Sequence, residues 1–596
     1  MDIRTTGGPS SAEEIAAVDG VLGQPESLWE GGQRRPADDH IAFGGRAARS
    51  QRPLLLPVLH AIQDRIGWVS RGALEYACRR LSIPPAEAYG VVSFYARFAL
   101  EERPALALHV CDDIACKCAG ADELCAALEK SIGPAGRMWH RSPCLGLCDR
   151  APAALVERAG ATHDERQIAP ITFEAAQEIL GGGVWPPRPT TLSPAGRGRL
   201  LRRVGVVDPE SIDSYREHGG FAALRRAREM GAEAVISELT VAKLLGRGGA
   251  AFPTGRKWDS VSKAPARPHY LVCNADESEP GTFKDRELLE RDPFAVVEGM
   301  AIAAFATGCE KGYVFVRGEY PLARRRVENA IAQAKAGGLL EVDIEVRRGA
   351  WAYICGEETA LFNSIEGKRG EPRNKPPFPV QAGLFGKPTL VNNVETLINV
   401  LDIVVEGGAA FATTGTADST GTRLFCLSGN VRAPGLYEIS MGTTLRALID
   451  LAGGLRDGRT LQAVLLGGAA GSFVTESQLD VPLSFEGTRA IGATLGSGAV
   501  IVFDDTMDMK QILLRIARFF RDESCGQCVP CRVGTKRQEE ILERMLGSRG
   551  ADTHADVMLL SDIAQAMRDA SICGLGQTAA NAIASGLTQL KVINGG

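Results

Sequence analysis

The chain of 596 residues is 45% hydrophobic and 23% charged, which is enough length for roughly four domains with ordinary buried cores. Its 67 Lys and Arg side chains are balanced by 72 Asp and Glu, and no basic run exceeds residues 324–326, so we expect no nucleic-acid surface. The N-terminus has no apolar signal region and no apolar stretch reaches about 18 residues, so we expect a cytoplasmic protein without membrane insertion.

The first third of the chain divides into four segments. Residues 1–48 are rich in Gly, Pro, Asp and Arg without an apolar period, which predicts a flexible arm. Apolar residues then recur at helical spacing over 49–100, which predicts a helical unit. Residues 101–182 combine a strand, a helix near 121–131 and a hairpin, and the Pro- and Gly-rich residues 183–200 predict a linker.

Three further segments follow. Gly-punctuated strands and helices alternate over 201–420, a β-rich piece covers 421–505, and amphipathic helices occupy 506–596. The first of these helices, expected at 509–520, places Ile512, Ile516, Phe519 and Phe520 on one stripe.

Four cysteines of the N-terminal α/β unit have the spacing of a metal site: Cys111 and Cys116, then Cys144 and Cys148. Cytoplasmic thiols stay reduced, so clustered cysteines favour metal ligation over disulfides. Four thiolates suit a [2Fe-2S] cluster or a structural zinc ion, and four unrelated buried thiols are a further alternative.

The run CGQCVPC near the C-terminus sets Cys525, Cys528 and Cys531 three residues apart. This spacing is typical of three ligands of a [4Fe-4S] cluster, whose fourth ligand comes from elsewhere in the chain. Cys573 is the only later cysteine, so we expect it to be the fourth ligand.

Glycines are concentrated in LLGRGGAAFPTGRKW, where Gly246, Gly248 and Gly249 precede Lys257. Backbone N–H groups of such a loop can approach a phosphate closely beside a cation. The loop is neither a Walker A motif nor a GxGxxG fingerprint. The GLGQTA segment at 574–579 does fit GxGxxA, but it follows a cysteine rather than a strand, so we interpret it as a helix start.

Acidic and polar residues gather in two segments that glycines and prolines interrupt, CNADESEPGTFKDR and YICGEETALFNSIEGKRGEPRNKPPFP. On one surface helix such acids would be a solvated face. On loops they are typical of ligands for ribose hydroxyls and a flavin ring.

These motifs, together with VNNVET, carry a resemblance. Residues 205–590 resemble the FMN- and NADH-binding subunit of respiratory complex I and its soluble relatives, and residues 50–180 resemble the thioredoxin-like [2Fe-2S] subunit of the same module. The expected fold class is multidomain α/β, with an N-terminal helical plus thioredoxin-like domain, a Rossmann-like FMN/NAD domain, a small β-grasp-like domain and a C-terminal four-helix bundle.

The resemblance also implies site residues. FMN would be held by Gly246, Gly248, Gly249, Ala250, Lys257, Asn274, Asp276, Ser278, Tyr353, Asn392 and Asn393. NADH would stack between the flavin and Phe252, with Glu279, Glu358, Lys375 and Phe378 around its ribose and adenine. Ala251 stands where the family motif usually has glycine, which adds a methyl group beside the flavin or nicotinamide.

The combination of parts predicts an electron-transfer function. NADH gives up two electrons at once and iron-sulfur clusters accept one at a time, so a flavin must stand between them. No catalytic acid or base is required, and the residues above position the cofactors. The terminal substrate site must lie on another subunit.

The fusion resembles the beta subunit of soluble NAD-dependent formate dehydrogenases and the diaphorase subunit of NAD-reducing hydrogenases, whereas the two parts are usually separate in complex I. The hydrogenase relatives often lose N-terminal cysteines, and this chain keeps all four, which favours formate dehydrogenase and its alpha subunit as partner. Hydrogenase subunits or a complex I module remain alternatives. A zinc-bearing structural subunit with an empty flavin loop is the alternative from another class.

Overall fold

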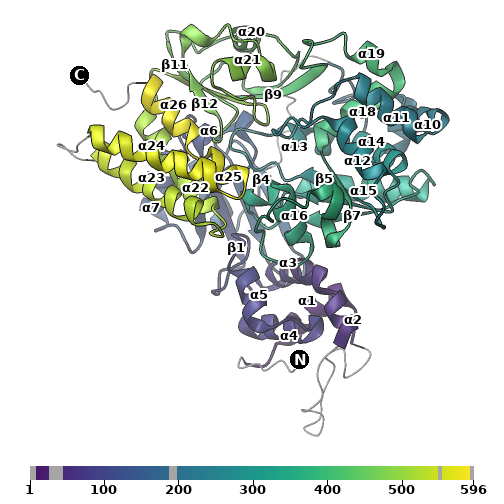
Figure 1. Ribbon diagram of the computed structural model, residues 1–596. Coiled ribbons are helices and arrows are strands. Elements are labelled where there is room, and N and C mark those ends of the chain that lie inside the picture. Colours follow the sequence, from purple (N-terminus) through teal and green to yellow (C-terminus); the bar gives the residue numbers. More distant parts are fainter. Residues whose placement is uncertain (1–7, 26–44, 187–197, 548–552, 591–596) are drawn as a thin grey trace.

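The computed structural model describes residues 8–25, 45–186, 198–547 and 553–590. Three sheets and several groups of helices make up this part of the chain (Figure 1). The predicted multidomain α/β fold class is confirmed. Within the described ranges, no helix combines the length and apolar character that a bilayer crossing requires.

Five helices form the N-terminal unit, which lies at one end of the molecule (Figure 1). They are α1 (Ala12–Leu22), α2 (Gly45–Ser50), α3 (Leu55–Ile66), α4 (Arg71–Leu81) and α5 (Pro85–Val92).

Helix α1 contradicts the expected flexible arm over residues 12–22. Ser11 and Glu14 form a capping box that begins the helix, and Val18 is completely buried. The buried Asp19 carboxylate forms an ion pair with Arg80 of α4 and accepts a hydrogen bond from Tyr76 at 2.8 Å. Local capping and one apolar contact therefore dock a segment that composition alone assigns to an arm. Residues 1–7 and 26–44 of the expected arm lie outside the described residues.

The thioredoxin-like domain contains a four-stranded sheet in the order β2-β1-β3-β4. Its elements are β1 (Leu106–Cys111), α6 (Ile114–Lys117), α7 (Ala121–Ser131), β2 (Trp139–Ser142), β3 (Ala154–Arg158), β4 (Asp164–Ile168) and α8 (Phe173–Leu180). Strands β3 and β4 pair antiparallel as the expected hairpin. Because β1 and β2 are parallel, Cys111 at the end of β1 and Cys144 just after β2 lie at the same edge of the sheet. Most of the expected linker, residues 187–197, lies outside the described part.

The Rossmann-like domain has a parallel sheet in the order β7-β6-β5-β8. Its strands are β5 (Tyr270–Ala275), β6 (Lys311–Val316), β7 (Asp343–Arg348) and β8 (Thr389–Asn393). Its helices are α9 (Ile212–Glu217), α10 (Ala222–Met230), α11 (Ala232–Val241), α12 (Thr254–Ser262), α13 (Lys284–Arg291), α14 (Pro293–Thr307), α15 (Pro321–Ala336), α16 (Glu358–Ile365), α17 (Pro379–Ala382), α18 (Val394–Glu406) and α19 (Gly408–Phe411). Ligands of such sheets bind outside the carboxyl ends of the strands, where Asp276 and Asn393 lie.

The remaining chain forms a mixed sheet and a helical bundle. The sheet, in the order β10-β9-β13-β11-β12, and its helices comprise β9 (Thr422–Gly429), β10 (Gly435–Ser440), α20 (Leu445–Leu451), β11 (Leu461–Leu466), β12 (Ser472–Val474), α21 (Phe485–Ala490) and β13 (Ala499–Asp504). The bundle, yellow in Figure 1, comprises α22 (Met509–Glu523), α23 (Val529–Gly547), α24 (Thr553–Ala570), α25 (Gly574–Thr578) and α26 (Asn581–Gln589). Helix α22 runs three residues beyond its expected end, and its predicted apolar stripe is buried.

The domains share apolar cores rather than meeting at wet surfaces. One continuous core contains Leu59 of α3, Leu361 of α16, Ile501 of β13 and Ile512 of α22. The ring of Tyr353 also packs edge-on against Phe519 of the bundle, with centroids 5.1 Å apart. Interfaces of this kind oppose independent domain motion.

Replacement of Asp19 by alanine should release α1 from α4. The substitution leaves Arg80 buried without its carboxylate, which typically costs about 3–5 kcal/mol. Hydrogen exchange should therefore lose its protection over residues 12–22. Glu13→Ala removes the exposed ion pair with Arg65 and should cost no more than about 1 kcal/mol. Equal protection of α1 in both variants would contradict this role for Asp19.

Candidate functional site

A cavity of about 390 Å³ lies where the Rossmann-like domain, the mixed sheet and the bundle meet. The predicted cofactor residues that line it are Gly248, Gly249, Ala250, Asn274, Asp276, Ser278, Glu279, Tyr353 and Asn393. They come from three stretches far apart in the sequence, and the carboxyl ends of β5 and β8 bring two of them together. The structure thus places a predicted glycine loop, a predicted carboxylate loop and a predicted tyrosine around one space.

The glycine loop leaves room that side chains would fill. A Cβ atom at Gly248 would lie 3.2 Å from the Cβ of Asn393, and one at Gly249 would lie 3.5 Å from the carbonyl carbon of Gly496. Gly249 also has a φ of 111°, in the region that favours glycine. The backbone of the loop is therefore exposed to the cavity, as close approach to a phosphate or flavin requires.

Polar atoms in the cavity wall lack a partner in the protein. Asp276 Oδ2 and Ser497 Oγ are buried and accept or donate no hydrogen bond among the described residues. Buried polar groups are almost always paired, so these two atoms indicate a polar ligand or water in the cavity. The donor set and the glycine cradle both fit FMN.

Two glutamates of the carboxylate loop are held in fixed positions. Glu279 accepts hydrogen bonds from Tyr353 Oη at 2.6 Å and from the N–H of Ala470 at 2.9 Å. Glu277 accepts from the N–H groups of Asp285 and Arg286 at 2.9 and 3.0 Å, at the start of α13. Burial raises the pKa of both glutamates to about 7.

Some predicted residues lie outside the wall of this cavity: Gly246, Phe252, Lys257, Glu358, Lys375, Phe378 and Asn392. The Lys257 ammonium donates to the carbonyl of Val391 at 3.1 Å and lies over the Phe252 ring, and burial lowers its pKa. The Asn392 side-chain oxygen accepts from the Trp258 indole at 3.0 Å, so it serves the packing of α12 against β8.

The mixed sheet and the bundle contribute wall residues that the sequence did not predict: Gly467, Ala470, Thr494, Gly496, Ser497, Gly574, Leu575 and Thr578. The segments GGAAGS and TLGSGA carried a glycine signal for part of this set. Residues 574–578 form α25, as the interpretation of GLGQTA as a helix start predicted, and they also line the cavity.

Ala251 adopts the glycine-type conformation despite its side chain. Its φ of 53° lies in the left-handed region, which costs a non-glycine residue about 1–2 kcal/mol. The alanine therefore keeps the backbone course of the loop instead of redirecting it.

The four N-terminal cysteines lie together as two pairs. The sulfurs of Cys144 and Cys148 are 3.3 Å apart, and Cys111 is hydrogen-bonded to Cys116. All four side chains are buried, and Cys111 and Cys116 both influence Cys148 electrostatically. Two close thiol pairs facing each other offer two ligands to each of two iron ions.

The same arrangement does not suit a single zinc ion. Tetrahedral Zn–S bonds of about 2.3 Å place all four sulfurs roughly 3.8 Å from one another. Across the described ranges, the one group of three ligand atoms that all lie within 4.8 Å is Glu157, His163 and Glu165. Both of these carboxylates already bind arginines, Arg97 and Arg348, which opposes a cation there.

The C-terminal cysteines converge at the start of α25. Cys573 is the N-cap residue of this helix, and the N–H groups of Leu575 and Gly576 donate to its sulfur. Gly576 lies against Cys531, since a Cβ atom there would be 2.9 Å from the Cys531 Cβ. Burial raises the pKa of Cys531 to about 11 and that of Cys573 to about 12, so metal binding would have to displace their protons.

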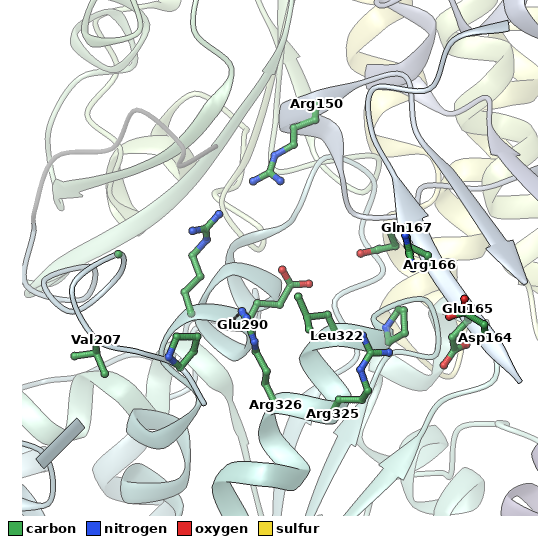
Figure 2. Close-up of a pocket in the computed structure, with 14 residues that line it drawn as sticks. Arg150, Asp164, Glu165, Arg166, Gln167, Val207, Glu290, Leu322, Arg325 and Arg326 are labelled. Carbon is green, nitrogen blue, oxygen red and sulfur yellow. Dashed lines mark hydrogen bonds between the residues drawn. The ribbon is translucent and has the colours of Figure 1, made fainter. Parts of the chain in front are cut away.

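A larger cleft, about 560 Å³, lies apart from these residues (Figure 2). Asp164, Glu165 and Arg166 of β4 line one side, and Glu290 and Arg326 line the other. None of the predicted cofactor or cysteine residues borders it. Volume alone therefore does not locate the chemistry, which follows the glycine loop and the orphaned polar atoms.

Four family models match the chain. They are the thioredoxin-like [2Fe-2S] ferredoxin over residues 45–179, the Nuo51 FMN-binding domain over 239–402, the SLBB domain over 424–469 and the NADH-ubiquinone oxidoreductase-F iron-sulfur binding region over 511–591. The chain therefore contains an FMN-binding domain and domains for a [2Fe-2S] and a [4Fe-4S] cluster.

Curated relatives and a solved structure agree with these matches. An F-type NADH-quinone oxidoreductase subunit of Rhizobium meliloti (strain 1021) is 45% identical over 403 residues, which cover 66% of this chain and 95% of the relative. NADP-reducing hydrogenase subunit HndC of Solidesulfovibrio fructosivorans is 44% identical over 394 residues, 64% of this chain and 80% of that protein. A chain of an air-oxidized NAD⁺-reducing [NiFe]-hydrogenase superimposes with a TM-score of 0.80 at 35% identity, covering 91% of this chain and 93% of that chain.

Replacement of Gly248 by valine should exclude FMN from the cavity. The new side chain would enter the space beside Asn393, whereas folding should largely survive because the loop faces a cavity rather than a core. The measurement is the amount of FMN per purified chain. Gly20→Val is the matched control, because this position is on an exposed face of α1 with no atom within 4 Å of the added Cβ. One FMN per chain and normal NADH oxidation in the Gly248 variant would refute the assignment of the loop.

Proposed function

The chain belongs to the family of F-type NADH-quinone oxidoreductase subunits and their soluble relatives, and from this premise we propose that it is the NAD(H)-reacting subunit of a multisubunit oxidoreductase. One observation carries the proposal. The cavity that fits FMN is lined by Gly574, Leu575 and Thr578, the helix that begins at the cluster ligand Cys573. The flavin site and the proposed [4Fe-4S] site therefore adjoin, as electron transfer between them requires.

The cofactor supplies the chemistry and the chain positions it. When bound, FMN allows exchange between the two-electron chemistry of NADH and the one-electron chemistry of iron-sulfur clusters. In the proposal, Gly248 and Gly249 give the flavin close access to backbone, and Asn274, Asp276 and Tyr353 fix its orientation from the opposite strand ends. No side chain is required to move a proton in the chemical step.

NADH would enter over an exposed aromatic rim. Phe252 and Phe378 are 44% and 52% exposed, which is unusual for phenylalanine and suits stacking with a nicotinamide or adenine ring. Lys375 donates to Glu357 at 2.9 Å and to Glu358 at 2.8 Å, and these carboxylates would accept hydrogen bonds from ribose hydroxyls. The same carboxylates would repel a 2′-phosphate, so the proposal favours NADH over NADPH.

We propose a soluble cytoplasmic NAD-dependent formate dehydrogenase as the complex, with this chain as its beta subunit and the alpha subunit as the site of formate chemistry. The four retained N-terminal cysteines support this choice over a hydrogenase. Reduced thiols in the cytoplasm suit assembly of the clusters.

A second candidate is the diaphorase subunit of an NAD-reducing hydrogenase. The match along 91% of this chain to a chain of an NAD⁺-reducing [NiFe]-hydrogenase favours it, because that chain has the same fused architecture.

Purification of the native complex through this chain should distinguish the two. For the formate dehydrogenase we expect a partner containing molybdenum or tungsten and formate-dependent reduction of NAD⁺. Nickel in the partner together with hydrogen-dependent NAD⁺ reduction would contradict it and favour the hydrogenase. A complex with neither metal, which reduces quinone, would contradict both and favour a complex I module.

Replacement of Cys573 by serine should separate the two halves of the reaction. Flavin bleaching on mixing with NADH should stay within about twofold of wild type, because Cys573 is proposed as a cluster ligand and not as a flavin ligand. Turnover coupled to the partner's substrate should be lost. The buried Cys309, which hydrogen-bonds Thr307 away from both clusters, provides the control Cys309→Ser. Coupled turnover at the wild-type rate without a [4Fe-4S] signal would contradict this electron route.

A further inference from the structure

Arg317 lies directly after β6, at the carboxyl end of the parallel sheet, and only 3% of its surface is exposed. Its backbone N–H donates to the carbonyl of Ala275 at 3.2 Å, which fixes the turn next to β5. The guanidinium packs over the Tyr320 ring at 5.3 Å. A fully charged side chain is thus enclosed between two domains.

The guanidinium joins two loops of different function. Nη1 donates to the backbone carbonyl of Glu277 at 2.8 Å, in the loop that lines the FMN cavity. Nη2 donates to the backbone carbonyl of Cys144, in the loop that carries a proposed [2Fe-2S] ligand. Nη2 also forms an ion pair with Glu319 at 2.9 Å.

Neighbouring contacts press the same two loops together. Arg286 Nε donates to the carbonyl of Gly146 at 2.8 Å. Gly146 leaves no room for a side chain, since a Cβ atom there would lie 2.0 Å from Tyr320 Oη. The N–H of Gly281 donates to the sulfur of Cys144. The cysteine loop therefore sits on the flavin-lining loop with little freedom.

The charge of Arg317 matters because reduction changes the charge of a cluster. A buried positive charge beside Cys144 stabilises the more negative, reduced state, and the low dielectric of the interior strengthens the effect. Charges and hydrogen bonds around the ligands are established means of setting cluster potentials.

We propose that Arg317 is a positioning residue that clamps the Cys144 loop to the flavin-lining loop and raises the reduction potential of the [2Fe-2S] cluster. The inference rests on the proposed ligands Cys111, Cys116, Cys144 and Cys148. Glu319 acts in the opposite sense, because its carboxylate partly offsets the guanidinium charge.

The test is an EPR-monitored redox titration of the purified full-length chain. One electron passes from dithionite, which is oxidised, through a mediator dye to the cluster, which is reduced without a bond forming or breaking. At a fixed solution potential, Arg317→Met should lower the ratio of reduced to oxidised [2Fe-2S] cluster about tenfold, a shift of about 59 mV for a one-electron couple. Glu319→Gln should raise this ratio, and Arg317→Lys should stay between Met and wild type.

Two internal controls isolate the effect. The [4Fe-4S] signal of the same samples should titrate at its wild-type potential in every variant. Arg203→Met removes a similarly buried arginine that pairs with Asp292 instead of the cysteine loop, and it should leave the [2Fe-2S] ratio unchanged.

The variants also overturn the proposal if it is wrong. A purely structural role predicts an unchanged ratio in folded Arg317→Met, or shifts of the same sign in Arg317→Met and Glu319→Gln. If Arg317→Met does not fold, an unchanged ratio in both Arg317→Lys and Glu319→Gln would be sufficient to reject it. A wild-type chain without a [2Fe-2S] signal, or with stoichiometric zinc, would instead refute the ligand set and with it the proposed function of the N-terminal domain.

Discussion

The carboxylate of Glu277 is bound by two N–H groups at the start of α13 and by the Tyr320 hydroxyl at 3.1 Å. These three donors fix the course of the loop that leaves β5. One side of that loop forms the wall of the FMN cavity, and the other side accepts the thioredoxin-like domain through Arg286 and Arg317. If this carboxylate lost its donors, the cavity wall and the seat of the cysteine loop would both lose their reference point.

Such a junction requires many buried charges, and their stability contribution is modest. Lys284 is completely buried between Asp285 and Glu395, with Nζ to carboxylate distances of 2.7 and 3.1 Å. Arg286 is equally buried and binds Asp149 and Glu287. Buried ion pairs often contribute little net stability because desolvation offsets their attraction. We therefore interpret these pairs as fixing the relative position of the domains, which apolar contacts alone specify less sharply.

The sequence predicted local chemistry well and domain junctions poorly. Cysteine spacing located both thiol groups, and the carboxylate loop after β5 lies in the cavity because strand ends converge by topology. Lys257 is different: its proximity to the glycine loop in sequence does not fix where a long side chain points, and the ammonium turns to the Val391 carbonyl. Wall residues such as Ser497 come from another domain, and no local pattern states which domains will meet. The capping box at Ser11 was a readable signal, but the composition around it outweighed it.

The position of the cavity links cofactor binding to assembly of the chain. Its wall takes Gly248 and Asp276 from one domain, Gly496 from a second and Gly574 from a third, so the complete cavity exists only when all three are docked. A ligand that contacts all of them binds the docked state and not the separated one, and by linkage it stabilises the docked state to the extent of its binding. The same docking places α25, with Cys573 at its first turn, beside the cavity. Retention of the flavin and the short path to the proposed cluster therefore depend on one packing arrangement, which explains why an apolar core runs without interruption from α3 to α22.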